Sequence, residues 1–118
     1  FMEKLKELSE LNELITLYQK GKQFFKETKK YHKLNYEEIF ILNYIHECQS
    51  YEVTAKEIAQ YSELKPYYLT KALQKLIKMG YLSKKRSDID EPTVVVYINE
   101  TQRQKIEHMI KTLQDYLK

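Results

Sequence analysis

The segment from Lys65 to Ser87 constrains the fold of this chain most strongly, because it frames one helix and carries charges of one sign. Pro66 suits the first position of a helix, where its missing N–H would have no partner, and Gly80 supplies the left-handed residue that ends one. Seven residues of this segment are basic and none is acidic. The whole chain has a net charge of only +3, so the other residues carry a net −4, with 13 basic residues against 17 acidic ones.

A basic helix that leads into a basic hairpin is the charge pattern of a protein that reads duplex DNA. Charge runs are more often solvated helix faces, but such faces usually mix both signs. We therefore predict a DNA-binding surface. Its predicted residues are Lys65, Tyr67, Tyr68, Thr70, Lys71, Gln74, Lys75 and Lys78 on the helix, and Lys84, Lys85 and Arg86 in the hairpin. The competing hypothesis is an adaptor that binds an acidic protein partner through the same lysine face.

Apolar spacing and capping signals predict a mainly α chain with a small β-hairpin. We expect helices at about residues 3–31, 36–48, 54–62, 66–79 and 100–118, a short extended segment at 50–53, and hairpin strands at 82–87 and 93–98. The order helix, tight turn, helix, hairpin over residues 54–98 is that of a winged helix-turn-helix, within a single domain of residues 1–118. The fourth helix would enter the major groove, and the hairpin would reach toward the neighbouring minor groove.

The two terminal helices, at about 3–31 and 100–118, carry apolar stripes that the winged core does not need. Stripes that stay exposed in a monomer indicate an association surface, and a homodimer would present two fourth helices to two half-sites. The residues predicted to dimerise are Leu5, Leu8, Leu11, Leu14, Ile15, Leu113 and Leu117. The alternative is that both helices simply pack on the core.

The kind of basic residue also constrains the DNA that is read. Of the 20 basic residues only Arg86 and Arg103 are arginine. Guanine is best recognised by a bidentate arginine, whereas lysine is a mobile point charge suited to phosphates. The outward face of the fourth helix offers tyrosine, threonine, lysine and glutamine. We therefore predict an A/T-rich target, recognised largely through backbone contacts and groove shape.

Other functional classes find little support in the sequence. No apolar run is long enough to span a membrane, and the N-terminal segment lacks a secretion signal. Cys48 is the single cysteine, which fits a reducing cytoplasm, and we expect it to be a small buried hydrophobe. The histidines, His32, His46 and His108, are too far apart to indicate a metal site. We expect a cytoplasmic protein that is not an enzyme, has no cofactor and no membrane partner, and shows no recognisable effector pocket.

Three stretches resemble the staphylococcal accessory regulators, the Sar branch of the MarR-like winged-helix transcription factors. They are LNYEEIFILNYI at Leu34–Ile45, the motifs KEIA and LKPYYLTKALQKL within Lys56–Leu76, and the motifs LSKKRS, DE and TVVVY within Leu82–Tyr97. The resemblance implies a homodimeric cytoplasmic DNA-binding protein that regulates virulence genes at A/T-rich promoters. It also implies that the first helix dimerises. The hairpin is called the wing in this family, and its tip is expected to enter the minor groove.

The wing departs from the family pattern at one position. The family has Asp-Glu-Arg, in which the arginine is the expected minor-groove contact, whereas this chain has Asp90-Glu91-Pro92. Arg86 and Asp90 match the family and could pair to hold the hairpin, so Asp90 joins the predicted DNA-binding residues. The minor-groove role does not carry over to Pro92. Weaker binding, or a greater dependence on the hairpin lysines, would follow.

Overall fold

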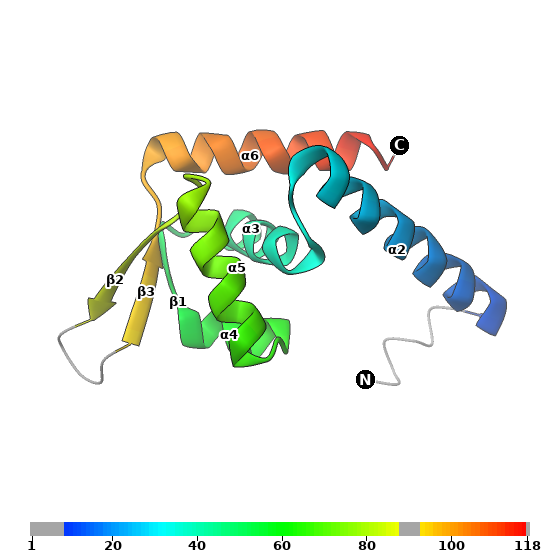
Figure 1. The fold of residues 1–118 in the computed structure, drawn as a ribbon, viewed down its shortest axis with the longest axis horizontal. Coiled ribbons are helices and arrows are strands. Elements are labelled where there is room, and N and C mark those ends of the chain that lie inside the picture. Colours follow the sequence, from blue (N-terminus) through cyan, green and yellow to red (C-terminus); the bar gives the residue numbers. More distant parts are fainter. Residues whose placement is uncertain (1–8, 88–92, 118) are drawn as a thin grey trace. The chain divides into compact units, whose positions relative to one another are not determined.

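The computed structural model describes residues 9–87 and 93–117 (Figure 1). The chain divides into two compact units, residues 1–35 and 36–118. The first contains α2 (Leu11–His32), and the second contains α3 (Tyr36–Cys48), β1 (Glu52–Thr54), α4 (Ala55–Ser62), α5 (Pro66–Lys78), β2 (Ser83–Ser87), β3 (Thr93–Tyr97) and α6 (Glu100–Asp115). The predicted stripe residues Leu5 and Leu8, and the wing-tip residue Asp90, lie outside the described residues. Over the described ranges, no helix is both long and apolar enough to cross a membrane.

The predicted helix starts are confirmed at three places. The Thr54 hydroxyl accepts a hydrogen bond from the Glu57 amide at 3.0 Å and so caps α4. Pro66 stands at the start of α5. Asn99 and Gln102 form a complete capping box at α6, since each side chain accepts from the other residue's amide. Thr54 and Asn99 pair with amide groups at the helix ends that would otherwise lack a partner, and Pro66 has no such amide. The starts of these helices can therefore be predicted from neighbouring residues in the sequence.

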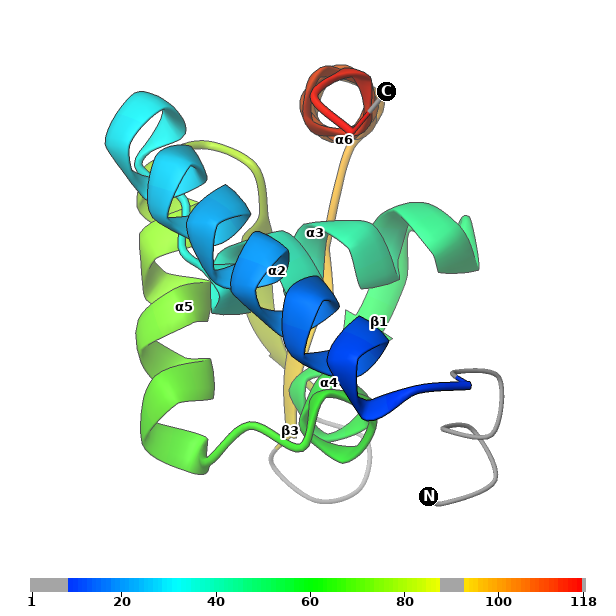
Figure 2. The same cartoon turned by 90° about the vertical axis from the view of Figure 1, so that its right-hand side faces the viewer.

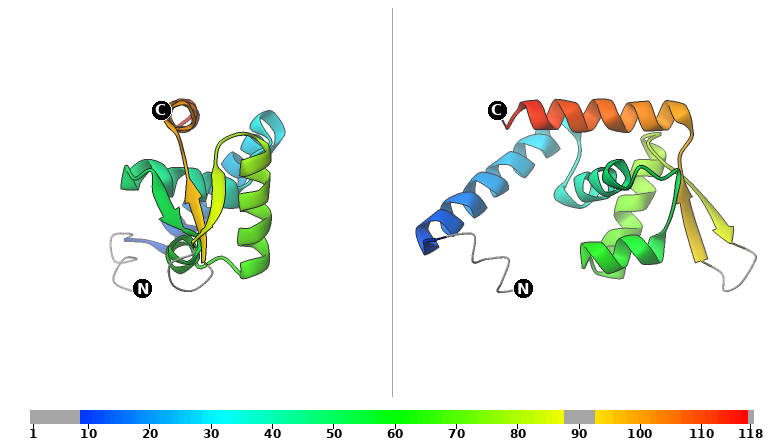
Figure 3. Two further views of the ribbon diagram at one scale, coloured as in Figure 1. Left: turned by 90° about the vertical axis from the view of Figure 1, so that its left-hand side faces the viewer. Right: turned by 180° about the vertical axis from the view of Figure 1, so that it is seen from behind.

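The sheet is larger than the predicted hairpin. It has three antiparallel strands in the order β1-β3-β2, because the extended segment near residue 53 pairs with β3 (Figure 3). Val96 in the central strand faces Val53 on one side and Lys84 on the other. The two valines are 1% and 6% exposed, respectively, so this face of the sheet belongs to the core.

The core of the second unit forms around α3, which packs against α4, α5 and α6. From α6 it receives Ile106, Ile110 and Leu113, each less than 5% exposed. The expectation that the stripe of the C-terminal helix would be exposed is therefore wrong, and Leu113 is a core residue because α6 lies along α3. Leu117, beyond the end of α6, is 69% exposed.

The second unit places α5 and the hairpin so that both reach the same side. The N-terminal end of α5, next to α4, and the hairpin ends of β2 and β3 point in the same direction (Figures 1 and 3). Figure 2 shows α4 and α5 joined by the short turn at residues 63–65. Glu63 adopts φ 58° in this turn, and its amide donates to the Ala59 carbonyl at 3.1 Å. This is the predicted winged helix-turn-helix arrangement.

Candidate nucleic-acid interface

One face of α5 is buried and the opposite face is open. The buried residues are Leu69, Ala72, Leu73 and Leu76. The exposed ones are Tyr67, Tyr68, Thr70, Lys71, Gln74 and Lys78, and Lys65 just before the helix is exposed as well. The predicted outward face is thus confirmed as accessible. No acidic residue lies within α5, so no carboxylate of the helix offsets the positive charge of its lysines or the positive N-terminal end of its dipole.

Aromatic contacts order the first turn of α5. The rings of Tyr67 and Tyr68 meet edge to face with centroids 5.5 Å apart. The ammonium of Lys71 lies 5.4 Å from the Tyr67 ring centroid. Both rings remain more than half exposed, so they present π-faces and hydroxyl groups to solvent beside a cation.

Lys75 is less available than the sequence predicted. Its ammonium donates a hydrogen bond to a Glu38 carboxylate oxygen at 3.0 Å, and Glu38 is 4% exposed. The Lys75 side chain is 35% exposed and lies on the flank between the buried and open faces. It links α5 to α3, so its first role is structural, and a phosphate would have to share it with a buried carboxylate.

The pleat of the sheet divides the basic triplet of the wing. Lys84 is opposite Val96 and Arg86 is opposite Val94, so these two side chains leave β2 on the core side of the sheet. Lys85 is opposite Val95 and leaves on the outer side. All three basic side chains are exposed. The sequence treated the triplet as one cluster, whereas the structure presents two cations on one face and one on the other.

Lys85 has a partner on its own face. Its ammonium lies 2.6 Å from a Glu52 carboxylate oxygen on β1 and 5.4 Å from the ring centroid of Tyr97 on β3. The hydrogen bond to Glu52 raises the pKa of Lys85 above its usual value, and the charge of the carboxylate adds to this. The contact spans all three strands, since Tyr97 belongs to the strand between them.

A turn and a lysine fix the C-terminal end of α5. The Gly80 amide donates to Ile77 O at 3.0 Å and the Tyr81 amide to Leu76 O at 2.9 Å, which together form a Schellman motif. Gly80 has φ 87°, as the motif requires. The Lys105 ammonium of α6 donates to the Met79 carbonyl near this end, where the helix dipole is negative.

Two tyrosines connect α3 to the first helix of the helix-turn-helix. The Tyr44 hydroxyl donates to the Glu57 carboxylate at 2.6 Å, which raises the pKa of Tyr44 above its usual range. The ring of Tyr44 stacks on that of Tyr61 with centroids 5.5 Å apart. Ile58, which is fully buried, completes the attachment of α4. The turn before α5 is therefore held from both the core side and the surface side.

Arg103 is a structural residue. It is 6% exposed, donates to the Ser50 carbonyl at 2.8 Å and stacks 4.1 Å from the Tyr51 ring centroid. The Tyr51 hydroxyl in turn donates to Glu100, which raises the pKa of Tyr51. Arg86 is consequently the arginine of this chain that is exposed, and it lies in the wing and not on α5.

Cys48 does not occupy the expected buried position. It is exposed, and its thiol donates to the Tyr44 carbonyl at 3.0 Å, because it stands in the last turn of α3 where the helix reaches the surface. Within residues 9–87 and 93–117, no group of three or more His, Cys, Asp and Glu side chains could hold a metal ion.

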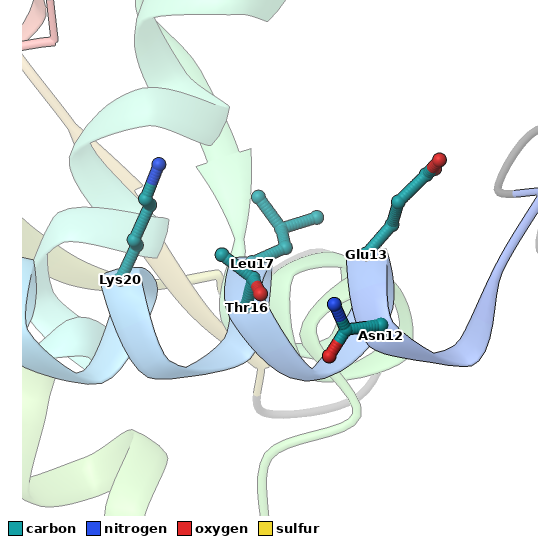
Figure 4. Close-up of a pocket in the computed structure, with 5 residues that line it drawn as sticks. All are labelled: Asn12, Glu13, Thr16, Leu17 and Lys20. Atoms are coloured by element: carbon teal, nitrogen blue, oxygen red, sulfur yellow. The ribbon is translucent and has the colours of Figure 1, made fainter.

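In the first unit, α2 keeps much of its apolar stripe exposed. Leu11, Ile15, Leu17 and Tyr18 are 72%, 46%, 59% and 66% exposed, and Leu14 is half-buried. An open depression runs along the same helix (Figure 4). Its lining residues are Asn12, Glu13, Thr16, Leu17 and Lys20. This mixed surface on one helix is not an enclosed ligand pocket.

The acidic partners of the basic segment were not predicted from the sequence. Glu38 and Glu52 lie outside the window of residues 65–87, so a local charge count could not connect them to Lys75 and Lys85. A signal was available for Glu52 alone. If the segment near residue 53 had been paired with the TVVVY strand, Glu52 would have fallen beside Tyr97.

The sequence matches a known family of transcriptional regulators over most of its length. Residues 23–109 match the family model described as transcriptional regulator SarA/Rot. The chain is 50% identical over 114 residues to the HTH-type transcriptional regulator SarR of Staphylococcus aureus (strain USA300). The aligned residues cover 97% of this chain and 99% of SarR. This agrees with the resemblance seen in the sequence motifs and with the expectation that the chain is not an enzyme.

Solved structures show the same fold at lower identity. The transcriptional regulator BldR from Sulfolobus solfataricus has a TM-score of 0.73 and 22% identity, covering 96% of this chain and 80% of BldR. A MarR transcriptional regulator from Methanosarcina mazei Go1 has a TM-score of 0.70 and 17% identity, covering 89% of this chain and 73% of that protein. With the matched family model and the identity to SarR, the chain belongs to the SarA/Rot family and is a DNA-binding transcriptional regulator of the SarR and SarA type.

Proposed function

We propose that this regulator is a cytoplasmic homodimer that binds A/T-rich promoter DNA and controls virulence genes. The observation that carries the proposal is the open face of α5, where tyrosine, threonine, lysine and glutamine side chains are exposed and no acid interrupts them. Such a face fits the major groove of B-DNA, which admits one helix. An acidic protein partner at the same face is the competing occupant.

The contacts of α5 divide into two kinds. Tyr67, Thr70 and Gln74 are short or planar groups on the open face, suited to adenine edges and thymine methyl groups. Lys65 and Lys78 stand at the two ends of the helix, where the strands of a groove would flank it. This arrangement supports base reading near the centre of α5 and phosphate binding at its ends.

The preference for A/T-rich DNA rests on the position of arginine. Arg103 is buried, and Arg86 lies in the wing, so α5 offers no forked donor for the O6 and N7 acceptors of guanine. A/T-rich tracts also narrow the minor groove and deepen its negative potential, which favours a cationic wing. Both the absence of an arginine on α5 and the cationic wing therefore favour A/T-rich DNA.

Dimerisation is proposed through α2. Its exposed apolar patch would meet the same patch of a second copy, as a two-fold axis requires. Leu117 at the other terminus is exposed and stays a candidate, whereas Leu113 is already used in the core. A dimer would double the number of phosphate contacts and set the spacing of the two half-sites.

Titration of fluorescent duplexes at several salt concentrations tests the proposal. We expect tighter binding to A/T-rich than to G/C-rich duplexes, with a steep dependence of log K on log salt. Lys71→Gln should weaken binding and reduce the slope, whereas Lys111→Gln, at an exposed position on α6, should do neither. Binding that neither depends on salt nor distinguishes sequences would instead favour the acidic protein partner. Genome-wide mapping of bound sites tests the virulence genes as targets.

A further inference from the structure

The outer face of the wing carries a three-strand cluster with its own charge balance. Glu52 on β1 is opposite Tyr97 on β3, and Lys85 on β2 is opposite Val95, two residues before Tyr97. Because side chains alternate along a strand, Glu52, Tyr97 and Lys85 share one face. Lys85 extends diagonally across the Tyr97 ring to reach the carboxylate at 2.6 Å.

This pair differs from the other acid–base contact of the basic segment. Lys75 meets Glu38, which is 5% exposed at its side chain and belongs to the core. Lys85 and Glu52 are 54% and 57% exposed, so both groups can exchange their partner for water or for a phosphate. An exposed ion pair contributes little to the free energy of unfolding, so this pair does little to stabilise the fold. Its main effect is on the charge that the wing offers to DNA.

The two faces of the wing are therefore unequal. Lys84 and Arg86 leave β2 on the other face from Glu52, so the pleat directs them away from this carboxylate. A phosphate that binds Lys85 must displace Glu52 and would then lie close to an uncompensated negative charge. Such a contact gains less than one made by a lysine that has no acidic neighbour.

We propose that Glu52 holds Lys85 in an ion pair that keeps it from acting as a phosphate contact, and so lowers the affinity of the wing for DNA of any sequence. The proposal rests on the proposed function, because it concerns the same DNA-binding surface. Phosphate contacts carry no sequence information, so suppressing one lowers the affinity for every duplex by about the same factor. In this view the wing uses Lys84 and Arg86, and Lys85 positions β2 against β1.

The test is a double-mutant cycle of Glu52→Gln and Lys85→Gln in the full chain, with Lys84→Gln as the reference. Binding to a random duplex and to an A/T-rich duplex is measured at several salt concentrations. Glu52→Gln should steepen the salt slope by about 0.9 per protomer, the value for one released phosphate contact. Between 50 and 200 mM salt, each released contact would make the loss of affinity about 3- to 4-fold larger than in the wild type. Lys85→Gln alone should change the slope far less than Lys84→Gln does.

The double variant identifies the cause. If the gain of Glu52→Gln disappears in the Lys85→Gln background, the freed lysine is responsible, as proposed. A gain that persists without Lys85 would overturn the proposal, because it would come from the loss of any negative charge near DNA. Equal losses of slope in Lys85→Gln and Lys84→Gln would overturn it as well.

The charge-swapped variant, Glu52→Lys with Lys85→Glu, guards against a loss of folding in the single variants. It keeps an opposite-charge pair on the same face and should bind with the wild-type salt slope; a steeper slope would contradict the proposal. A failure of the proposed function looks different. In that case even Lys84→Gln and Lys71→Gln would leave the slope unchanged, whereas failure of this inference alone leaves both of those effects intact.

Discussion

Lys75 on α5 and Glu38 on α3 form an ion pair in which the carboxylate is buried and the ammonium is half-buried, at 3.0 Å. The two residues are 37 positions apart in the sequence. The pair ties the proposed recognition helix to the central helix of the second unit. A lysine that the sequence assigns to DNA therefore also determines how firmly α5 is held.

Replacing Lys75 by Ala should lower the free energy of unfolding. Glu38 would lose a charged partner while it remains buried, and such a loss costs about 1–3 kcal/mol. Urea denaturation followed by circular dichroism measures this change. Lys78→Ala on the exposed face of the same helix is the control and should stay within about 0.5 kcal/mol of wild type. Equal stability of the two variants would show that the pair contributes nothing.

Gln74 and Lys78 should affect DNA binding in different ways. Both are exposed on α5, but glutamine can pair with an adenine edge whereas lysine offers only a charge. Gln74→Ala should reduce the preference for the best duplex by about 1–3 kcal/mol. Lys78→Ala should weaken all duplexes about equally and reduce the salt slope by about one per protomer. Competition titrations with specific and random duplexes separate these outcomes, and identical effects of both variants would contradict the division.

The sequence predicted what is local and missed what joins distant segments. The capping box at Asn99 and the helix end at Gly80 depend on neighbouring residues, so their positions were predicted closely. The third strand, by contrast, requires β1 to find β3 more than 40 residues later, and periodicity does not contain that pairing. Leu113 shows the same limit, since an apolar stripe looks alike whether a core helix or a second copy covers it. The charge partners of Lys75 and Lys85 follow from the same long-range packing.

Gly80→Ala should destabilise the protein because φ 87° is strained for a residue with a Cβ atom. The expected cost is about 1–2 kcal/mol. A Cβ at this position would lie 3.2 Å from the Lys105 ammonium, a flexible group that is able to move. Gly80→Asn is the matched control, since asparagine adds the same Cβ but tolerates the left-handed region better. Thermal melting should rank wild type above Asn and Asn above Ala; equal losses would point to the Cβ contact instead of φ.

Pro92→Arg should strengthen binding to A/T-rich wing sites. Residue 92 lies outside the described residues, so this prediction comes from the sequence, where proline stands in place of the family's arginine. A guanidinium is favoured in a narrow A/T minor groove by its negative potential. Duplexes that differ only at the wing site, compared for Pro92→Arg and Pro92→Lys, measure the effect. Equal gains on all duplexes would reduce it to generic charge, and the absence of any gain would mean that the wing does not reach the groove.

Charge placed on the apolar stripe of α2 should separate the proposed dimer. Leu11 is 72% exposed and Leu14 half-buried, so a lysine at either position can keep its ammonium in solvent when the chain is a monomer. In a two-fold interface each lysine would face the apolar residues of the other copy, and the cost of desolvating its ammonium would arise in both copies. Sedimentation at micromolar concentration should show wild-type dimers and Leu11→Lys/Leu14→Lys monomers. DNA affinity should fall sharply in the same variant, because one half-site is lost.

The control carries the same two charges elsewhere on the helix. Thr16 and Gln23 are exposed and, at 100° per residue, lie on the side of α2 away from Leu11 and Leu14. Thr16→Lys/Gln23→Lys should sediment and bind DNA as wild type does, apart from a small gain from the added charge. If both double variants dissociate equally, added charge in general separates the copies and the stripe is not the interface. A wild-type protein that sediments as a monomer would refute dimerisation through α2 altogether.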